Sequence, residues 1–134
     1  MALWFRKPEK PAPPDLDLAY LNRLAGHIGE METRELLADG MIDLLDRLER
    51  VAELARAGSR AALAELAHDI AGAAGHLGLS RLSLAAVDAY RALREETPMH
   101  LEEVVASMIA CREGAIEALH DFSLGEKPAD AEDP

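Results

Sequence analysis

Apolar side chains recur at helical spacing between residues 63 and 77, and this periodicity constrains the fold more than any other feature of the chain. The stripe consists of Leu63, Leu66, Ile70, Ala73 and Leu77. Successive members are three or four residues apart, so at about 100° per residue they lie on one narrow side of a helix. A helix of this kind buries its apolar side against other helices. The stretch therefore predicts one helix of a bundle, which ends at Gly78.

A short leading helix and a long second helix are expected before this stretch. Asp15 or Asp17 can cap the leading helix, and Gly26 and Gly29 mark its end. The second helix is expected from about residue 30 to 57, because its apolar residues alternate four and three apart. The two stripes are Leu18, Leu21, Leu24 and Ile28, and then Leu37, Met41, Leu44, Leu48, Val51 and Ala55.

Two more helices are expected after the first stripe. Gly58 ends the second helix and Ser59 caps the third, while a fourth starts near Ser80. Thr97 followed by Pro98 is a strong start signal for the fifth. Their stripes are Leu82, Ala86, Ala89 and Leu93, and then Leu101, Val104, Met108, Cys111, Ala115, Ala118 and Phe122. No stretch alternates like a strand, so we expect an all-α, up-down-up-down four-helix bundle with a short N-terminal helix packed at one end.

Length and composition limit the domain organisation and the partners. The 134 residues predict one domain over 15–124, a flexible N-terminal tail over 1–14 and a disordered acidic tail over 125–134. The segment Leu3-Trp4-Phe5 is either a small anchor or part of a frayed tail, and it is too short for a membrane span. A net charge of −11 argues against nucleic acid as a partner. A single cysteine, Cys111, fits a cytoplasmic setting.

The side of the third helix opposite its apolar stripe has an unusual composition. His68 lies about 170° from the centre of the stripe, where a solvated helix normally carries long charged side chains. Its neighbours on that side are instead small: Ala61, Ala64, Gly72 and Gly75, with Ala71 alongside. Each glycine inside a helix costs about 0.8–1.0 kcal/mol relative to alanine. The pattern indicates that a partner approaches the helix closely at His68.

These residues also carry a family resemblance. The run Ala67-His68-Asp69-Ile70, then Gly72, then Gly78 and Leu82, resembles the signature of the histidine-containing phosphotransfer (HPt) domains, over roughly residues 17–122. The resemblance implies that His68 accepts and donates a phosphoryl group. It implies as partners a response-regulator receiver domain, which carries the Mg²⁺, or a hybrid histidine kinase.

Ala71 departs from the family pattern, which usually has a lysine three residues after the histidine. The change removes a cation next to the phosphoryl group, so charge neutralisation must come from the partner or from a neighbouring helix. Arg81, at the start of the fourth helix, is the candidate from the sequence. The residues expected to contact the partner are Ala61, Ala64, Ala71, Gly72 and Gly75.

The predicted function is that of a phosphorelay intermediate, a carrier of the phosphoryl group rather than a turnover enzyme, with no metal or cofactor of its own. A neutral imidazole nitrogen is a good nucleophile near neutral pH. The alternative is a helical module that docks a receiver domain or a histidine kinase without being phosphorylated. A di-iron site built from Glu65, His68, Glu117 and His120 is disfavoured, because both histidines lie opposite the apolar stripes of their helices.

Overall fold

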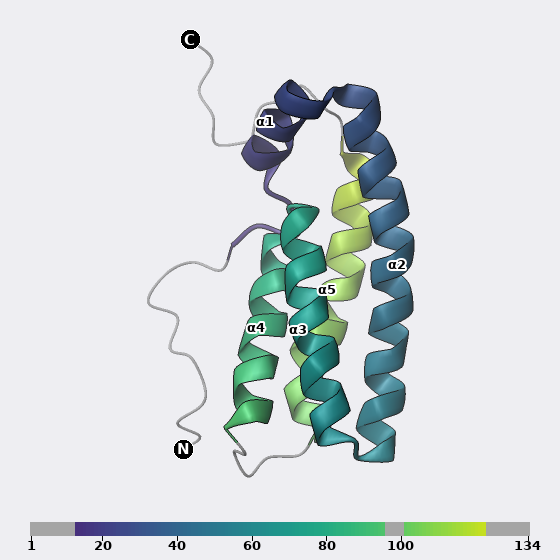
Figure 1. The fold of residues 1–134 in the computed structure, drawn as a ribbon, viewed down its shortest axis with the longest axis vertical. Helices are drawn as coiled ribbons and strands as arrows, with labels where there is room; N and C mark the ends of the chain where they lie inside the picture. Colours follow the sequence, from purple (N-terminus) through teal and green to yellow (C-terminus); the bar gives the residue numbers. More distant parts are fainter. Residues whose placement is uncertain (1–12, 96–100, 123–134) are drawn as a thin grey trace.

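The computed structural model describes residues 13–95 and 101–122, and all regular structure in these two ranges is helical. The five helices are α1 (Leu18–Ile28), α2 (Glu30–Ala57), α3 (Arg60–His76), α4 (Ser80–Arg94) and α5 (Leu101–Asp121). Figure 1 shows them as a long bundle with α1 across one end. The all-helical prediction is confirmed. The expected start of α5 at Thr97-Pro98, the segment Leu3-Trp4-Phe5 and the whole acidic C-terminal tail lie outside the described residues.

Most helix ends lie at the residues that the sequence indicates. Asp17 caps α1, because its side chain accepts a hydrogen bond from the backbone N–H of Tyr20 at 3.0 Å. Gly29 separates α1 from α2, and Gly58, with φ of 71°, ends α2 in the left-handed conformation. Ser59 precedes α3 as expected, but its side chain makes no capping hydrogen bond. The start of α3 is tied down instead by Arg60, whose guanidinium lies against the end of α4.

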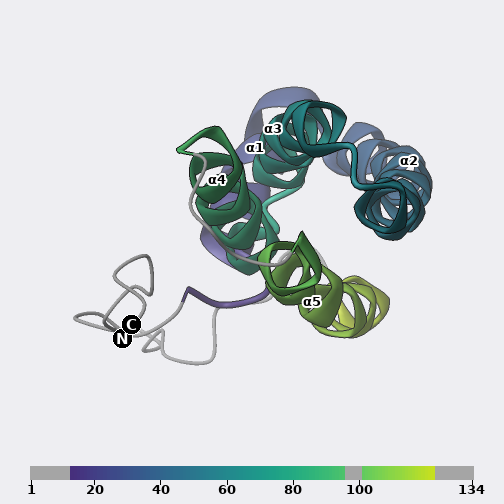
Figure 2. The ribbon, with the colours of Figure 1, turned by 90° about the horizontal axis from the view of Figure 1, so that it is seen from below.

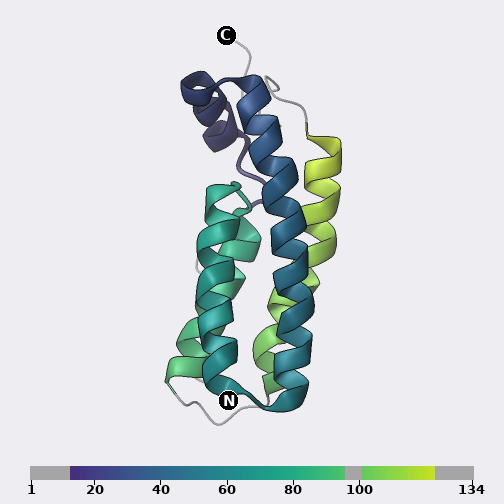
Figure 3. The ribbon, with the colours of Figure 1, turned by 45° about the vertical axis from the view of Figure 1, so that its right-hand side comes forward.

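The four longer helices surround one apolar core. Helix α3 packs against α2 and α4, and α5 packs against α4 and α2, so the four form a closed ring (Figure 2). Figure 3 shows α3 and α4 on one side of the bundle and α2 and α5 on the other. The largest fully buried side chains are Leu21, Leu44, Leu63, Ile70, Leu79, Leu82, Met108, Val51 and Thr33. Most of them belong to the predicted stripes.

Some stripe predictions differ from the structure in detail. Ile28 is exposed because it lies in the last turn of α1, beyond the core. Val105 is buried although it was not part of the predicted stripe of α5. Ala67 and Ala74 are also fully buried, because α3 packs against two helices and therefore buries a wider arc than one stripe. The side chains of Leu101 and Val104 are outside the described set.

The segment before α1 is fixed to the end of the bundle where α3 turns into α4. The backbone N–H of Asp17 donates to the carbonyl of Gly78 at 2.8 Å. Arg81 donates from Nε to the carbonyl of Pro13 at 3.1 Å, and its Nη1 lies 3.4 Å from the Asp15 carboxylate. The same carboxylate lies over Gly114 of α5, where an added Cβ would be 2.7 Å from Asp15 Oδ1. The segment 13–17 is therefore held against the bundle by contacts of Pro13, Asp15 and Asp17.

Candidate functional site

His68 lies near the middle of α3, and its side chain is exposed. Its ring contacts the ring of Tyr90 on α4, with 5.1 Å between the ring centroids and 45° between the ring planes. Among the described residues, neither imidazole nitrogen takes part in a hydrogen bond or an ion pair. Both nitrogens are therefore open to a reaction partner, and the ring is oriented by the aromatic contact, which is worth about 0.5–1.5 kcal/mol for such pairs.

Three of the five small residues predicted around His68 lie on an open surface. Ala61, Gly72 and Gly75 are exposed. A Cβ added to Gly72 would meet nothing within 4 Å, and one added to Gly75 would only touch the Ser83 hydroxyl oxygen at 3.6 Å. At Gly72 and Gly75, over two turns of the helix beside the imidazole, no side chain therefore projects from the surface. This arrangement leaves room for a partner to approach the ring.

The other two small residues are less open, and the expectation of a solvated side was wrong for Ala64. Ala64 is only 6% exposed, because it faces the contact between α3 and α4 near Tyr90 and Leu93. Ala71 is half-buried against the core, and its backbone carbonyl accepts a hydrogen bond from the Ser83 hydroxyl at 2.9 Å. Both alanines allow α4 to approach α3 closely. Their small size is explained by helix packing.

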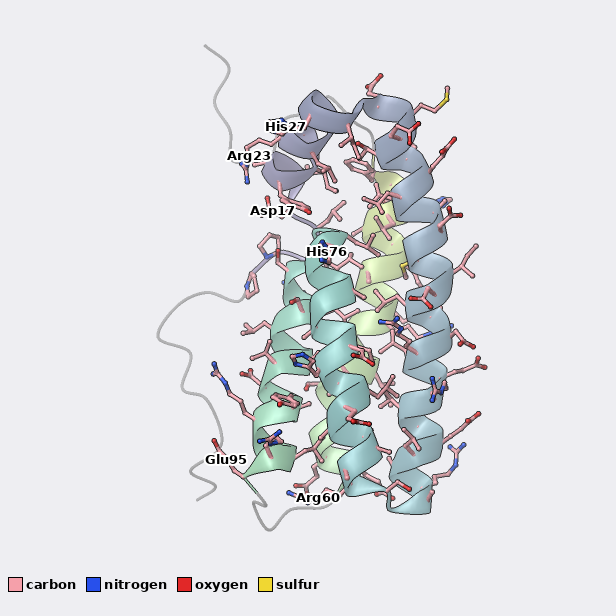
Figure 4. The ribbon with its side chains drawn as sticks, in the orientation of Figure 1. Asp17, Arg23, His27, Arg60, His76 and Glu95 are labelled. Carbon is pink, nitrogen blue, oxygen red and sulfur yellow. The ribbon has the colours of Figure 1, made fainter. Side chains whose placement is uncertain are left out.

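A groove with a volume of about 1050 Å³ runs between α3 and α4 beside His68. Its walls carry the exposed acidic residues Glu65 and Asp69 as well as two arginines, Arg60 and Arg94. Figure 4 labels Arg60 at the end of α3 remote from His76, so the groove extends from His68 toward that end of the bundle. The groove therefore holds two guanidinium groups and two carboxylates beside the imidazole.

Arg81, the cation predicted to face His68, is engaged elsewhere. It binds Pro13 and Asp15 at the N-terminal end of α4. Tyr90, which contacts His68, lies nine residues further along α4, or about 13 Å along the helix axis at 1.5 Å per residue. The prediction for Arg81 is therefore wrong, because no local pattern indicates that residues 13–15 contact this arginine.

Arg94 is the cation that sequence reasoning missed. Its guanidinium carbon lies 5.7 Å from the centroid of the Tyr90 ring, and its Nη1 donates to the Tyr90 hydroxyl oxygen at 3.2 Å. Arg94 follows Tyr90 by four residues, which places the two side chains on one side of α4. That spacing is visible in the sequence. What the sequence does not reveal is that this side of α4 faces His68.

The remaining candidate residues are not assembled into a site. Glu65, Glu117 and His120 are exposed like His68, and no three His, Cys, Asp or Glu side chains within residues 13–95 and 101–122 converge as metal ligands would. Cys111 is half-buried, and burial raises the pKa of its thiol, with a further rise from the Asp15 carboxylate and a smaller opposing effect from Arg81. A thiol of raised pKa is a poor nucleophile at neutral pH. His76 is exposed, and its backbone carbonyl accepts a hydrogen bond from the Tyr20 hydroxyl.

Comparison with known protein families connects this geometry to a function. The family model of the Hpt domain matches residues 32–122, which include α3, α4 and α5 and all of α2 except its first two residues, but not α1. Neither the curated proteins nor the solved structures gave a match. None of the helices in the described ranges has an apolar segment long enough to cross a bilayer. The match covers more than half of the chain and includes both His68 and α4, the helix that contacts it. This chain therefore belongs to the Hpt domain family.

Proposed function

We propose that this protein is a histidine phosphotransfer intermediate of a two-component phosphorelay, with His68 as the residue that accepts and donates the phosphoryl group. Hpt domains act in such relays. The observation that carries the proposal is the exposed His68 imidazole, whose nitrogens have no hydrogen-bond partner among the described residues, beside the open surface of Gly72 and Gly75. Such a ring can meet an incoming phosphoryl group in line.

The reaction proceeds between His68 and the phosphorylated aspartate of a receiver domain. The unprotonated imidazole nitrogen attacks phosphorus, a P–N bond forms, and the P–O bond to the aspartate breaks with its electron pair remaining on the carboxylate. The other imidazole nitrogen keeps its proton throughout. The reverse reaction returns the phosphoryl group. Transfer of this kind depends on positioning and charge neutralisation, so the receiver domain contributes its Mg²⁺ and this chain contributes a positioned nucleophile.

The partner contacts α3 at Ala61, Gly72 and Gly75, where the exposed helix surface carries only a methyl group or no side chain. Ala64 and Ala71 contribute indirectly, by letting α4 lie close to α3. A receiver domain or the receiver region of a hybrid histidine kinase is the partner that the family suggests. The single cysteine supports a reducing, cytoplasmic setting for the relay.

The bundle that presents His68 has, we further propose, the up-down-up-down arrangement of four helices with α1 added at one end. The turn at Gly58 and Ser59 joins α2 to α3 at the lower end of Figure 1, and residues 77–79 join α3 to α4 at the other end. The closed ring in which α5 returns to α2 supports the same arrangement.

Labelling with a panel of receiver domains tests the function. Receiver domains carrying ³²P on their aspartate are mixed with the protein, and the phosphate that it takes up is assayed for stability in acid and base. We expect an acid-labile, base-stable phosphate on the wild type and none on His68→Gln, which should remain folded because the side chain is exposed. His76→Gln and His120→Gln are matched controls that should label normally.

Two results would contradict the proposal in different ways. Phosphate on His76 or His120 would mean that another histidine is the acceptor. Binding of a receiver domain without any labelling would instead favour the alternative of a docking module that is not phosphorylated. The replacement of the usual lysine by Ala71 is the observation that keeps this alternative open.

A further inference from the structure

Tyr90 contacts both the phosphoacceptor candidate, His68, and Arg94, an arginine that lines the same groove. Its ring lies 5.1 Å from the ring of His68, centroid to centroid, and 5.7 Å from the guanidinium carbon of Arg94. Its hydroxyl oxygen accepts a hydrogen bond from Arg94 Nη1 at 3.2 Å. Tyr90 therefore contacts both the imidazole and an exposed arginine that lines the same groove.

The other arginine of the groove has a structural task that Arg94 does not share. Arg60 donates from Nε to the carbonyl of Leu93 at 3.1 Å and from Nη2 to the carbonyl of Ala92 at 3.2 Å. These carbonyls belong to the last turn of α4, where the backbone has no partner within the helix. Removing Arg60 would therefore loosen α4. Arg94 makes its hydrogen bond to the end of a side chain, so its guanidinium can move without breaking a helix end.

We propose that Arg94 supplies the positive charge for the phosphoryl group on His68 that the family's lysine usually supplies, and that Tyr90 is a positioning residue for both partners. This inference rests on the proposed function of His68. The Tyr90 ring fixes the plane of the imidazole, and the Tyr90 hydroxyl holds the guanidinium in the groove until the phosphoryl group arrives. Arg94 then donates to the phosphoryl oxygens, which are stronger acceptors than a neutral phenol.

Chemical phosphorylation of the isolated protein tests this inference without a receiver domain. Phosphoramidate is the donor: the imidazole nitrogen forms a P–N bond, the P–N bond of the donor breaks, and ammonia leaves with the electron pair and the protons that it already carried. Uptake is followed by ³¹P NMR. We expect Arg94→Gln to lower the uptake rate about tenfold, which corresponds to about 1.4 kcal/mol for one charge-assisted hydrogen bond.

Arg91→Gln is the matched control for net charge. Arg91 lies three residues before Arg94 on the same helix and is also exposed, but it does not line the groove. Its removal should leave the uptake rate and the phosphorus spectrum unchanged. In Arg94→Gln, by contrast, the midpoint of the ³¹P titration of the phosphorylated protein should move to higher pH, because a nearby cation favours the dianionic form. An effect of similar size in both variants would overturn the assignment to Arg94.

Two variants of Tyr90 separate its two tasks. Tyr90→Phe keeps the ring but loses the hydroxyl, and we expect it to lower uptake about threefold, the size of a modest hydrogen-bond loss. In the Arg94→Gln background the same change should cause no further loss, because the hydroxyl acts only through the arginine. Tyr90→Leu removes the aromatic ring as well, so it should abolish the ring-current shift of the His68 ring protons. Tyr90→Phe keeps the ring and should retain that shift. Additive effects of Tyr90→Phe and Arg94→Gln would contradict the positioning role.

A conservative variant completes the test. Arg94→Lys keeps a positive charge at the same position of α4, and it should retain most of the uptake that Arg94→Gln loses. A normal uptake rate in Arg94→Gln, or a loss in Arg94→Lys as large as that in Arg94→Gln, would overturn the inference while leaving His68 as the acceptor. If wild-type protein takes up no phosphate on His68, the proposed function itself fails, so the two failures are distinguishable.

Discussion

Gly72 and Gly78 are six residues apart on α3 and the turn that follows it, but a methyl group added to each would meet different surroundings. At Gly72 it would meet nothing within 4 Å. At Gly78, which has φ of 74°, it would lie 3.1 Å from the ring of Tyr20 and 3.3 Å from Leu21 Cγ. One glycine lies on an open surface beside His68, and the other lies where α1, α3 and α4 meet.

The difference separates two reasons for a glycine in one short segment. Gly78 is required by the fold, because an L side chain rarely adopts its backbone conformation and because the neighbouring α1 leaves no space. Gly72 and Gly75 are not required by the fold, and they lower helix stability. Two glycines that lower helix stability therefore lie beside the exposed His68 side chain, where they keep the surface accessible. Substitutions at the two places should therefore have effects of opposite sign.

The largest effect on stability is expected at Gly78. Gly78→Ala should lower the free energy of unfolding by about 2–3 kcal/mol, from the left-handed backbone and from overpacking against Tyr20 and Leu21. Thermal and urea melts measure it. Gly58→Ala is the matched control, since Gly58 has φ of 71° but nothing within 4 Å of an added Cβ. It should lose only the backbone contribution of about 1 kcal/mol. Equal losses in both variants would mean that crowding by α1 contributes nothing.

The next effect is expected in transfer rather than in stability. Gly75→Arg should fold as well as the wild type, because the position is exposed and a cation is favourable near the C-terminal end of a helix. Its long side chain lies about 10 Å along the helix from His68, on nearly the same side. Transfer from a receiver domain should fall about tenfold or more, the equivalent of at least about 1.4 kcal/mol. Gly75→Ala is the control and should transfer normally; a normal rate in Gly75→Arg would remove Gly75 from the docking surface.

The smallest effect is a gain in stability at Gly72. Gly72→Ala should raise the free energy of unfolding by about 0.8–1.0 kcal/mol, the difference in helix propensity between the two residues. The added methyl group meets no neighbour that could offset the gain. A melt monitored by circular dichroism is sufficient to measure it. A loss of stability would show that the open surface around His68 is covered in solution, which would erase the contrast with Gly78.

Helix positions were predictable because local signals determine them. Asp17, Gly29, Gly58 and Gly78 each carry the chemistry of a helix end, and α2 spans the residues expected from its periodicity. The position of the segment before α1, by contrast, depends on a long-range contact. Arg81 binds Pro13, which is 68 residues away in the sequence, and no local pattern indicates that pairing.

The candidate site was only partly predictable for a related reason. The rotation of about 100° per residue was sufficient to predict that His68, Gly72 and Gly75 lie on the open side of α3. Such a prediction depends on the geometry of a single helix. The burial of Ala64 and the contact of Tyr90 with His68 depend on how α4 is rotated against α3. Alanine and glycine are equally compatible with an open surface and with a close helix contact, so composition could not decide between them.

The α3–α4 pair is joined at both of its ends. Residues 77–79 connect the helices covalently at one end, and at the other the Arg60 side chain binds the carbonyls of Leu93 and Ala92. The two helices consequently cannot slide past each other without breaking one of these links. A partner that docks on the groove meets a surface whose shape is already established, so association spends little conformational entropy on this side.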